Sequence, residues 1–232
     1  MFRGQLGKIL HRYDGAVYSR FFAPVRETGV PSGLHDPPRP FVLRVRHLEG
    51  ATLKDFHIGL NVFQTNNADL VAIYQAIEEL ARESLHAEFH GLEGSDILQL
   101  PMSGAPSAER VRVNFLSLTE LKNQERPEFG PLFARVRDRI STLRALYGTG
   151  PLEIDFKTMG ERAAAIRMTR CELQHFEISR GTGQRHPLGG FLGVAEYEGD
   201  LTEFIPYLEI AAYTGVGRQT VWGKGEISVE TF

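Results

Sequence analysis

Apolar positions recur at regular spacing along the second half of the chain and predict its elements. Residues 110–118 alternate apolar and polar side chains, which is typical of a half-buried strand. Residues 132–147 place an apolar stripe, from Phe133 to Leu143, on one face of a predicted helix. Weaker patterns predict a short helix at 152–162, strands at 164–172, 174–179 and 191–197, a helix at 202–213 and a last strand at 226–229. The resulting order, β-α-β-β-α-β, is that of a ferredoxin-like unit.

The first half of the chain predicts the same order without its opening strand. The patterns indicate a helix at 3–12, strands at 41–48 and 56–63, a helix at 67–85 and a bent or hairpinned strand over 87–92 and 96–101. The opening strand of this fold is central, so its loss would leave backbone groups of its neighbours unpaired. We therefore expect an α+β fold of tandem ferredoxin-like (RRM-like) domains, the N-terminal one lacking its first strand. The expected boundaries are 1–104, with a proline-rich loop at 24–40, and 105–232, with a glycine-rich loop at 215–225.

Composition describes an ordinary soluble globular protein. Hydrophobic residues make up 42% and charged residues 24% of the 232 residues. No apolar run approaches the roughly 18 residues that span a membrane, and the N-terminus lacks the pattern of a signal peptide. The single cysteine, Cys171, excludes an internal disulfide and a cysteine-rich metal site. We therefore expect a cytoplasmic protein without membrane partners.

The net charge of −3 argues against nucleic-acid binding, for which a basic surface is the usual sign. The distribution of charge matters more than its sum, however. Arginine greatly outnumbers lysine among the 26 basic residues, and arginine suits bidentate contacts with phosphate, although a genomic codon bias would give the same excess. Within 201–232 the only basic residues are Arg218 and Lys224, and both lie in the glycine-rich loop.

The glycine-rich loop reads GVGRQTVWGKG and contains two pairs of glycines. These are Gly215 with Gly217 and Gly223 with Gly225. Glycine allows positive φ and close approach of the backbone, and exposed N–H groups in such a loop can bind anionic oxygens. A tight connection at a sheet corner would use the same residues. The order helix, loop, strand excludes a P-loop or a Rossmann fingerprint, which both run strand, loop, helix.

With GGFLGVAEYEGDLTEFIPYLEIAAYTG before it, the loop resembles the glycine-rich C-terminal signature of the RAMP superfamily. The chain is most similar to the CRISPR-associated endoribonucleases of the sixth Cas family, which cut precursor CRISPR RNA within its repeats. The segments FRGQLGKIL, PPRPFVLRV, VRVNFLSLTELK, FARVRDRISTLRALYG and SRGTGQRHPLGGFLG follow the order of that family. The resemblance covers nearly the whole chain, and its specific motif is C-terminal. The chain departs from the family in lacking the opening strand and the cysteines that some relatives carry after the first helix.

This resemblance implies an RNA-binding endoribonuclease that needs no metal or other cofactor. The 2′-hydroxyl would attack its own phosphodiester and leave a 2′,3′-cyclic phosphate. The implied partners are CRISPR repeat RNA, the guide RNA made from it and other Cas proteins of a multi-subunit effector complex. One alternative is a non-catalytic RAMP subunit that holds the guide RNA. A ferredoxin-like module that binds another ligand, unrelated to RNA, would fit the negative charge.

The resemblance implies His11 as the catalytic histidine, since relatives often place one on the first helix. The reaction needs a base near neutral pKa and donors for the charged phosphorane, and histidine and lysine supply them. Lys8 lies one turn from His11 on the predicted helix, and Tyr13 follows closely. A surface histidine stabilised by the helix dipole is the alternative for His11. His186 is the second candidate.

RNA contacts are expected from the glycine-rich loop and from residues opposite it: Gly215, Gly217, Arg218, Gly223, Lys224, Gly225, Arg180, Arg185 and His186. Trp222 is expected in the core, with base stacking as the alternative. The arginines of 132–147 are expected on a solvated face. The other histidines are assigned structural or surface roles: His47 and His57 facing one another in a hairpin, His175 in a strand, and His35, His86 and His90.

Overall fold

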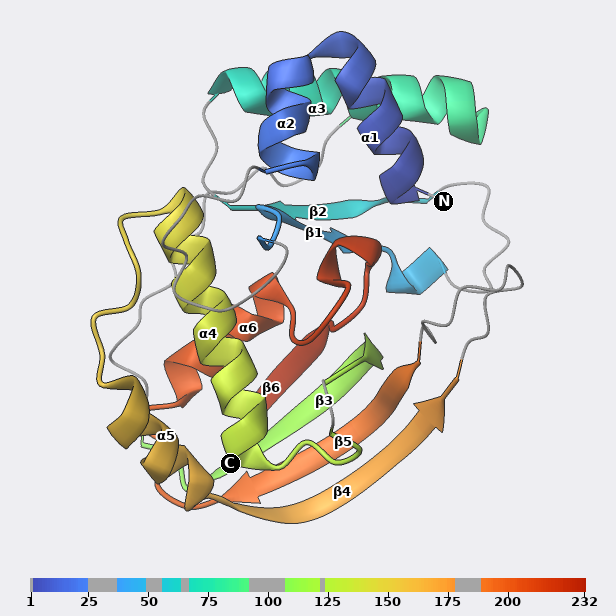
Figure 1. The fold of residues 1–232 in the computed structure, drawn as a ribbon. Coiled ribbons are helices and arrows are strands. Elements are labelled where there is room, and N and C mark those ends of the chain that lie inside the picture. Colours follow the sequence, from blue (N-terminus) through green and yellow to red (C-terminus); the bar gives the residue numbers. More distant parts are fainter. Residues whose placement is uncertain are drawn as a thin grey trace.

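The computed structural model describes residues 2–24, 37–48, 56–63, 67–91, 107–121, 124–177 and 189–232 (Figure 1). The first half contains α1 (Phe2–Tyr13), α2 (Gly15–Phe22), β1 (Phe41–Arg44), the turn η1 (Arg46–Leu48), β2 (Gly59–Val62), α3 (Asn67–Leu80) and the π-helical turn η2 (Ala81–Leu85). The second half contains β3 (Arg110–Thr119), α4 (Phe129–Tyr147), α5 (Phe156–Ala164), β4 (Arg167–Phe176), β5 (Gly190–Glu198), α6 (Ile205–Thr214), the 3₁₀ turn η3 (Thr220–Trp222) and β6 (Ile227–Thr231).

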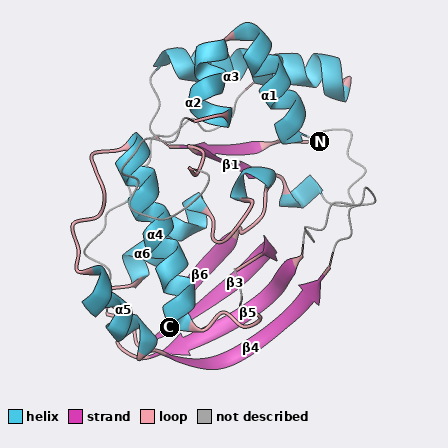
Figure 2. Cartoon of the chain, in the orientation of Figure 1, coloured by secondary structure: helices cyan, strands magenta, loops and turns pink. Residues whose placement is uncertain are grey.

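The second half forms the predicted ferredoxin-like unit. Its strands pair in the order β4-β5-β3-β6, and every pair is antiparallel. Helices α4 and α6 lie together beside the sheet, as Figures 1 and 2 show. The alternation along β3 has the predicted effect, because Val111, Val113 and Phe115 point into the core and their neighbours point outward. The rings of Phe133 and Phe204 meet edge to face at 4.7 Å in this core.

Several predicted bounds in this unit are corrected by the structure. One continuous strand, β4, replaces the two predicted at 164–172 and 174–179, and residue 164 ends α5 instead. Helix α5 begins at Phe156 because the Asp155 carboxylate caps it, accepting the N–H groups of Lys157 and Thr158. Helix α6 begins later than predicted, so that Pro206 falls in its first turn, where its missing N–H is not needed.

The N-terminal unit consists of a two-stranded sheet and three helices. Strands β1 and β2 pair antiparallel, with Phe41 opposite Val62, and helices α1, α2 and α3 lie on the same side of them (Figure 1). Together the two units form the tandem ferredoxin-like fold, and among the described residues the N-terminal sheet has only these two strands. The boundary predicted at 104/105 lies among residues 92–106, outside the described residues, and stays a prediction.

Three local predictions in the N-terminal unit need correction. Residues 15–22 form helix α2, which the pattern did not predict and which Asp14 caps by accepting the N–H groups of Ala16 and Val17. Strand β1 ends at Arg44 rather than at residue 48, and β2 is shorter than predicted. Residues 87–91 form no strand, and 92–106 lie outside the described residues. Helices α1 and α3 occupy the predicted positions.

The two units share a boundary at the glycine-rich loop. The turn η3 packs against β1, and its Val221 is buried in the core of the N-terminal unit, although the surrounding sequence belongs to the C-terminal unit. Figure 1 shows this loop between β1 and the C-terminal sheet, close to the start of α1. No helix within the described ranges is long and apolar enough to cross a membrane.

Candidate functional site

A surface hollow of about 330 Å³ runs along one face of α1. It is lined by Arg3, Gly4, Gly7, Lys8 and His11 of α1 and by Tyr18 and Phe22 of α2; we call it the α1 hollow. The α1 residues lie three or four apart and therefore share a helix face. A Cβ on Gly7 would come within 2.9 Å of the Phe22 ring, so glycine is what lets the two helices close together there. The structure thus places two of the three predicted catalytic residues, His11 and Lys8, in one open site.

The His11 ring is held by aromatic contacts rather than by hydrogen bonds. It meets the Tyr18 ring edge to face, at 4.7 Å and 81°, and Tyr18 in turn stacks on Phe22 at 5.7 Å. His11 is solvent-exposed, and neither of its ring nitrogens has a hydrogen-bond partner among the described residues. Both nitrogens are therefore available to a substrate in the hollow.

Tyr13, the third predicted catalytic residue, does not line the hollow. Its ring lies 5.5 Å from the Arg12 guanidinium, and it hydrogen-bonds toward α3 at Glu79. Side-chain hydrogen bonds lower the pKa of Glu79. The bond from Arg82 has the largest effect, and those with Glu83 and Tyr13 add to it. Tyr13 was predicted near His11 because it lies two positions further along the chain. Residues two apart on a helix do not face each other, so their side chains point in different directions. Tyr18, from the helix that the sequence did not predict, contacts His11 instead.

The glycines of the loop are required for the path of the chain. All four have positive φ, between 71° and 85°. A Cβ on Gly225 would lie 2.0 Å from the Val216 carbonyl oxygen, and one on Gly217 would lie 2.4 Å from the Glu120 carbonyl oxygen. Gly215, Gly223 and Gly225 are buried, and their N–H groups donate to protein carbonyls. Direct contact of these three with RNA, as predicted, is therefore not supported by this geometry.

Arg218 ties the loop to the end of β3. Its guanidinium lies 2.9 Å from the Glu120 carboxylate, and its N–H donates to the Glu120 carbonyl. Lys224 is half-buried in the same loop. The charge of Arg218 is therefore already compensated within the protein, by the Glu120 carboxylate.

Three side chains bind the carbonyl oxygens at the C-terminal end of α6. Arg44 of β1 donates to Ala212 and Tyr213, and Asn61 of β2 donates to Tyr213 at 2.9 Å. Arg139 of α4 donates to the carbonyl oxygen of Thr214. It also donates to the hydroxyl oxygen of Thr220, which lies in the glycine-rich loop. Side chains of both units thus fix the start of the loop, and the cations complement the negative end of the helix dipole.

The prediction of a solvated arginine face on α4 is wrong for two of its arginines. Burial first, and then the positive charge of Arg44, lower the pKa of Arg139 to about 10. Arg137 is buried; it pairs with Asp138 and donates to the carbonyl oxygen of Phe156. These arginines join the helix to its neighbours and are not available as a binding surface.

Trp222 is exposed, which corrects the prediction of a core role. Its side chain is 43% exposed, whereas its neighbour Val221 fills the core position. The Arg3 guanidinium lies over the Trp222 ring, 4.5 Å from its centroid. The indole therefore lies next to the α1 hollow, which Arg3 also lines.

The cations near the α1 hollow have no acidic partners among the described residues. Arg3, Lys8 and the nearby Arg39 make no ion pair there, while most other described arginines do. Burial first, and then the positive charge of Arg39, lower the pKa of Arg3. The objection raised by the negative net charge therefore does not apply to this surface.

The remaining predicted residues lie elsewhere. Arg180, Arg185 and His186 fall within 178–188 and His35 within 25–36, outside the described residues. His47 and His57 stack at 4.0 Å, which confirms their predicted pairing, and His175 packs on Phe191. None of the described histidines outside α1 lines the hollow. Among the residues that the structure describes, no three His, Cys, Asp or Glu side chains are grouped to hold a metal ion.

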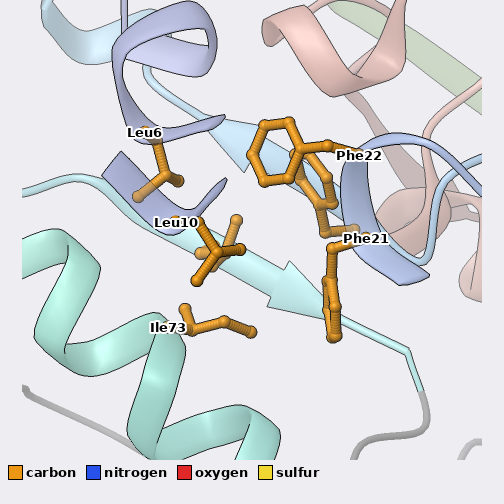
Figure 3. Close-up of a pocket in the computed structure, with 7 residues that line it drawn as sticks. Leu6, Leu10, Phe21, Phe22 and Ile73 are labelled. Atoms are coloured by element: carbon orange, nitrogen blue, oxygen red, sulfur yellow. The ribbon is translucent and has the colours of Figure 1, made fainter. Parts of the chain in front are cut away.

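A second pocket lies inside the core of the N-terminal unit and is not a binding site. Figure 3 shows its apolar lining, from Leu6 and Leu10 of α1 to Ile73 of α3. The pocket has a volume of only about 10 Å³ and no polar surface. It is a small packing gap, since even a water molecule needs more room and polar partners.

Comparison with known proteins agrees with this architecture. Solved structures share the fold across nearly the whole chain: Thermus thermophilus Cas6 (TTHB231) in a product complex has a TM-score of 0.68 and 18% identity, covering 99% of this chain and 92% of that one. The product complex of Cas6 (TTHA0078) has a TM-score of 0.57 and 14% identity, covering 99% and 91%. No curated protein matches the chain in sequence.

Two ferredoxin-like units with a glycine-rich loop before the last strand give the chain a RAMP-like fold. The family described as "CRISPR-associated endoribonuclease Cas6" matches residues 113–227, from β3 into β6. The chain belongs to this Cas6 family of CRISPR RNA-processing endoribonucleases.

Proposed function

We propose that the protein cleaves CRISPR repeat RNA in the α1 hollow by metal-independent attack of the 2′-hydroxyl on the adjacent phosphodiester. The observation that supports this most directly is the pairing of His11 and Lys8 in one exposed hollow whose cations have no acidic partners among the described residues. A polyanion can enter such a site without competing with protein carboxylates.

The proposed step needs few groups. The His11 imidazole takes the proton of the 2′-hydroxyl while the new 2′-oxygen–phosphorus bond forms. The Lys8 ammonium, one helical turn away, stabilises the negative charge that develops on the phosphorane oxygens. The bond to the 5′-oxygen breaks, and this oxygen takes a proton from water that reaches the exposed hollow. The hydroxide left behind takes the proton from the His11 imidazolium, so that neutral His11 is restored. The products are a 2′,3′-cyclic phosphate and a 5′-hydroxyl.

Tyr18 is proposed as a positioning residue for this step in place of Tyr13. Its edge-to-face contact limits rotation of the His11 ring, and its own stacking on Phe22 fixes it in turn. Tyr13, 52% exposed and bonded toward α3, has no route to the hollow in this arrangement.

The proposed substrate follows from the family and from related proteins. Cas6 proteins of this fold form a product complex and a substrate mimic complex. For this chain we propose that repeat RNA extends from the α1 hollow across Gly217, Arg218 and Lys224 of the loop. The segment with Arg180, Arg185 and His186 would supply further contacts. Retention of the guide RNA and assembly with other Cas proteins belong to the same proposal.

Incubation of the purified protein with its genome's CRISPR repeat RNA in EDTA tests the proposal. We expect cleavage to a cyclic-phosphate end, and a rate that falls about 10²- to 10⁴-fold in His11→Ala while RNA affinity is retained. The matched control is His90→Ala, because His90 is exposed and lies outside the hollow. A 2′-deoxy nucleotide at the cleaved position should block the wild-type enzyme.

The other outcomes discriminate between the alternatives. Undiminished cleavage by His11→Ala would exclude His11 as the base. Loss of activity in EDTA that a divalent cation restores would contradict the metal-independent mechanism. Tight binding of the repeat without cleavage would instead support a non-catalytic RAMP subunit that holds guide RNA.

A further inference from the structure

Trp222 is held at the surface by the shape of its turn. The turn η3 is flanked by Gln219 and Gly223, both with left-handed backbone conformations, φ 63° and 85°. The backbone N–H of Trp222 donates to the carbonyl oxygen of Gln219 at 2.8 Å. Val221 anchors the turn in the core of the N-terminal unit. The exposed indole is therefore presented by a fixed backbone and does not lie on a loose loop.

Arg3 occupies one face of this indole and is incompletely bonded. Its guanidinium lies 4.5 Å from the centroid of the Trp222 ring and 5.8 Å from that of Phe22. Its Nε is buried and has no hydrogen-bond partner among the described residues. A buried donor without a partner is unfavourable unless a ligand or water completes it. The stacked plane leaves the edge of the guanidinium as the part that can donate.

We propose that Trp222 and Arg3 form a nucleotide subsite, in which a nucleobase of the RNA stacks on the exposed indole and the Arg3 guanidinium binds the adjoining phosphate. This inference rests on the proposed function, and it adds a second binding point at the opposite end of the α1 hollow from His11. Stacking on an aromatic ring tolerates any base, whereas arginine bonds a phosphate through its edge while its plane stays stacked. The subsite would hold the strand in position without reading its sequence.

The chain offers a direct probe, because Trp222 is its only tryptophan. Wild-type protein is titrated with repeat RNA that carries a 2′-deoxy nucleotide at the cleaved position, so that nothing is cut. We expect the tryptophan emission to be quenched and to saturate together with binding measured by gel shift. Replacing single nucleotides by abasic ones should abolish the quenching at one position while most binding remains.

Affinity variants test the same subsite independently of the emission. Trp222→Ala should weaken binding roughly 10-fold, the usual effect of one lost base stack, and Trp222→Phe should restore most of it. Arg3→Lys should bind the RNA less tightly than wild type, since a lysine side chain keeps the charge but does not stack on the indole. The control is Phe176→Ala, which removes an equally exposed ring from β4. Equal melting temperatures would show that each variant folds.

The failure of this inference can be distinguished from failure of the proposed function. Unchanged emission at saturating RNA, with cleavage intact, would overturn the subsite and leave the His11 mechanism standing. Quenching without cleavage would support the subsite and contradict the nuclease. Quenching that survives every abasic substitution would also overturn base stacking, because the emission would then report only a nearby change.

Discussion

The α1 hollow and the outer face of the C-terminal sheet both carry basic side chains, but these side chains have different surroundings. On the sheet, Arg112 of β3 pairs with Glu196 at 2.8 Å and with Glu230 at 3.2 Å. Arg170 of β4 pairs with Glu172 and also with Glu196. Further along the same face, Glu198 forms ion pairs with Arg110 and Arg167. Around the α1 hollow, Arg3 and Lys8 have no such partners among the described residues.

Under the proposed function, the pairing of charges, and not their number, would mark the surface that binds RNA. RRM domains bind RNA on the face of their sheet through aromatic residues. Here the corresponding face carries a network of arginine–glutamate pairs, which offers little net positive charge to a phosphate backbone. The hollow combines a histidine, an exposed tryptophan nearby and cations that make no ion pair with any described residue. The loop joins the two regions, since its glycines pack on β3 at one end and on β1 at the other.

The largest effect is expected from Gly225→Ala, on the side of the loop that faces the sheet. A Cβ there would lie 2.0 Å from the backbone oxygen of Val216, at a φ of 71°. The backbone cannot yield without breaking the hydrogen bond from the Gly225 N–H to the Leu118 carbonyl. We expect the free energy of unfolding to fall by more than about 3 kcal/mol, measured by urea denaturation.

Gly223→Ala is the matched comparison, because it has a similar φ of 85° on the side of the loop that faces β1. Its Cβ would meet the Cγ2 atom of the Val45 side chain at 2.7 Å, and a side chain can move. The loss in free energy of unfolding should be close to that of the left-handed conformation alone, about 1–2 kcal/mol. Equal losses in the two variants would contradict a distinction between backbone and side-chain contacts.

An intermediate effect is expected when cations are removed from one region or the other. Arg3→Ala with Lys8→Ala should weaken binding of uncleavable repeat RNA about 100-fold, since hydrogen bonds to charged groups contribute roughly 1.5–3 kcal/mol each. The slope of log affinity against log salt should flatten by about 1.4, because each single-strand phosphate contact contributes about 0.7. Filter binding between 50 and 200 mM salt, a range of roughly fourfold, measures both quantities.

The matched variant, Arg110→Ala with Arg167→Ala, removes the same charge from the sheet. Both side chains are exposed ion-pair partners of Glu198, and such pairs contribute little to stability. Affinity and salt slope should therefore change much less. A loss equal to that of the hollow variant would place the RNA on the sheet and contradict the comparison.

Periodicity predicted the C-terminal unit well because its elements depend on local alternation. The buried faces of β3 and α4 follow directly from their sequences, and the family resemblance led to the correct fold. Helix α2 was missed because its start depends on a single capping residue, Asp14, and its short run GAVYSRFF is rich in aromatic residues. The position of Pro206 did limit where α6 could begin.

The candidate site was predicted less completely, because its partners are distant in sequence. His11 and Lys8 share a helix face, which spacing alone can give. The contacts between Arg3 and Trp222, and between Arg139 and Thr220, join residues that only the tertiary structure brings together. The exposure of Trp222 could not be read from its neighbours, since Val221 was an equally good candidate for the core.

The smallest effect is expected at acid pH, where the sheet and not the α1 hollow is expected to respond. Hydrogen bonds from Arg170 lower the pKa of Glu172. Hydrogen bonds from Arg112 and, to a smaller extent, from Arg170 lower the pKa of Glu196, although burial opposes this. A lowered pKa in the folded state means that these carboxylates stabilise the fold above their unfolded pKa, near 4.3. That contribution disappears as the pH falls through the lowered folded values. Melting temperatures between about pH 7 and pH 3 should therefore decline less steeply in Glu196→Gln than in wild type.

Glu209→Gln is the control for this acid effect, because Glu209 is exposed and has no ion pair among the described residues. Its acid decline should match that of wild type. The α1 hollow should add nothing to the difference, since no carboxylate of the described residues pairs with Arg3 or Lys8. If Glu196→Gln and wild type declined in parallel, the arginine–glutamate network would be too weak to hold its arginines away from RNA, and the sheet would have to be reconsidered as a binding surface.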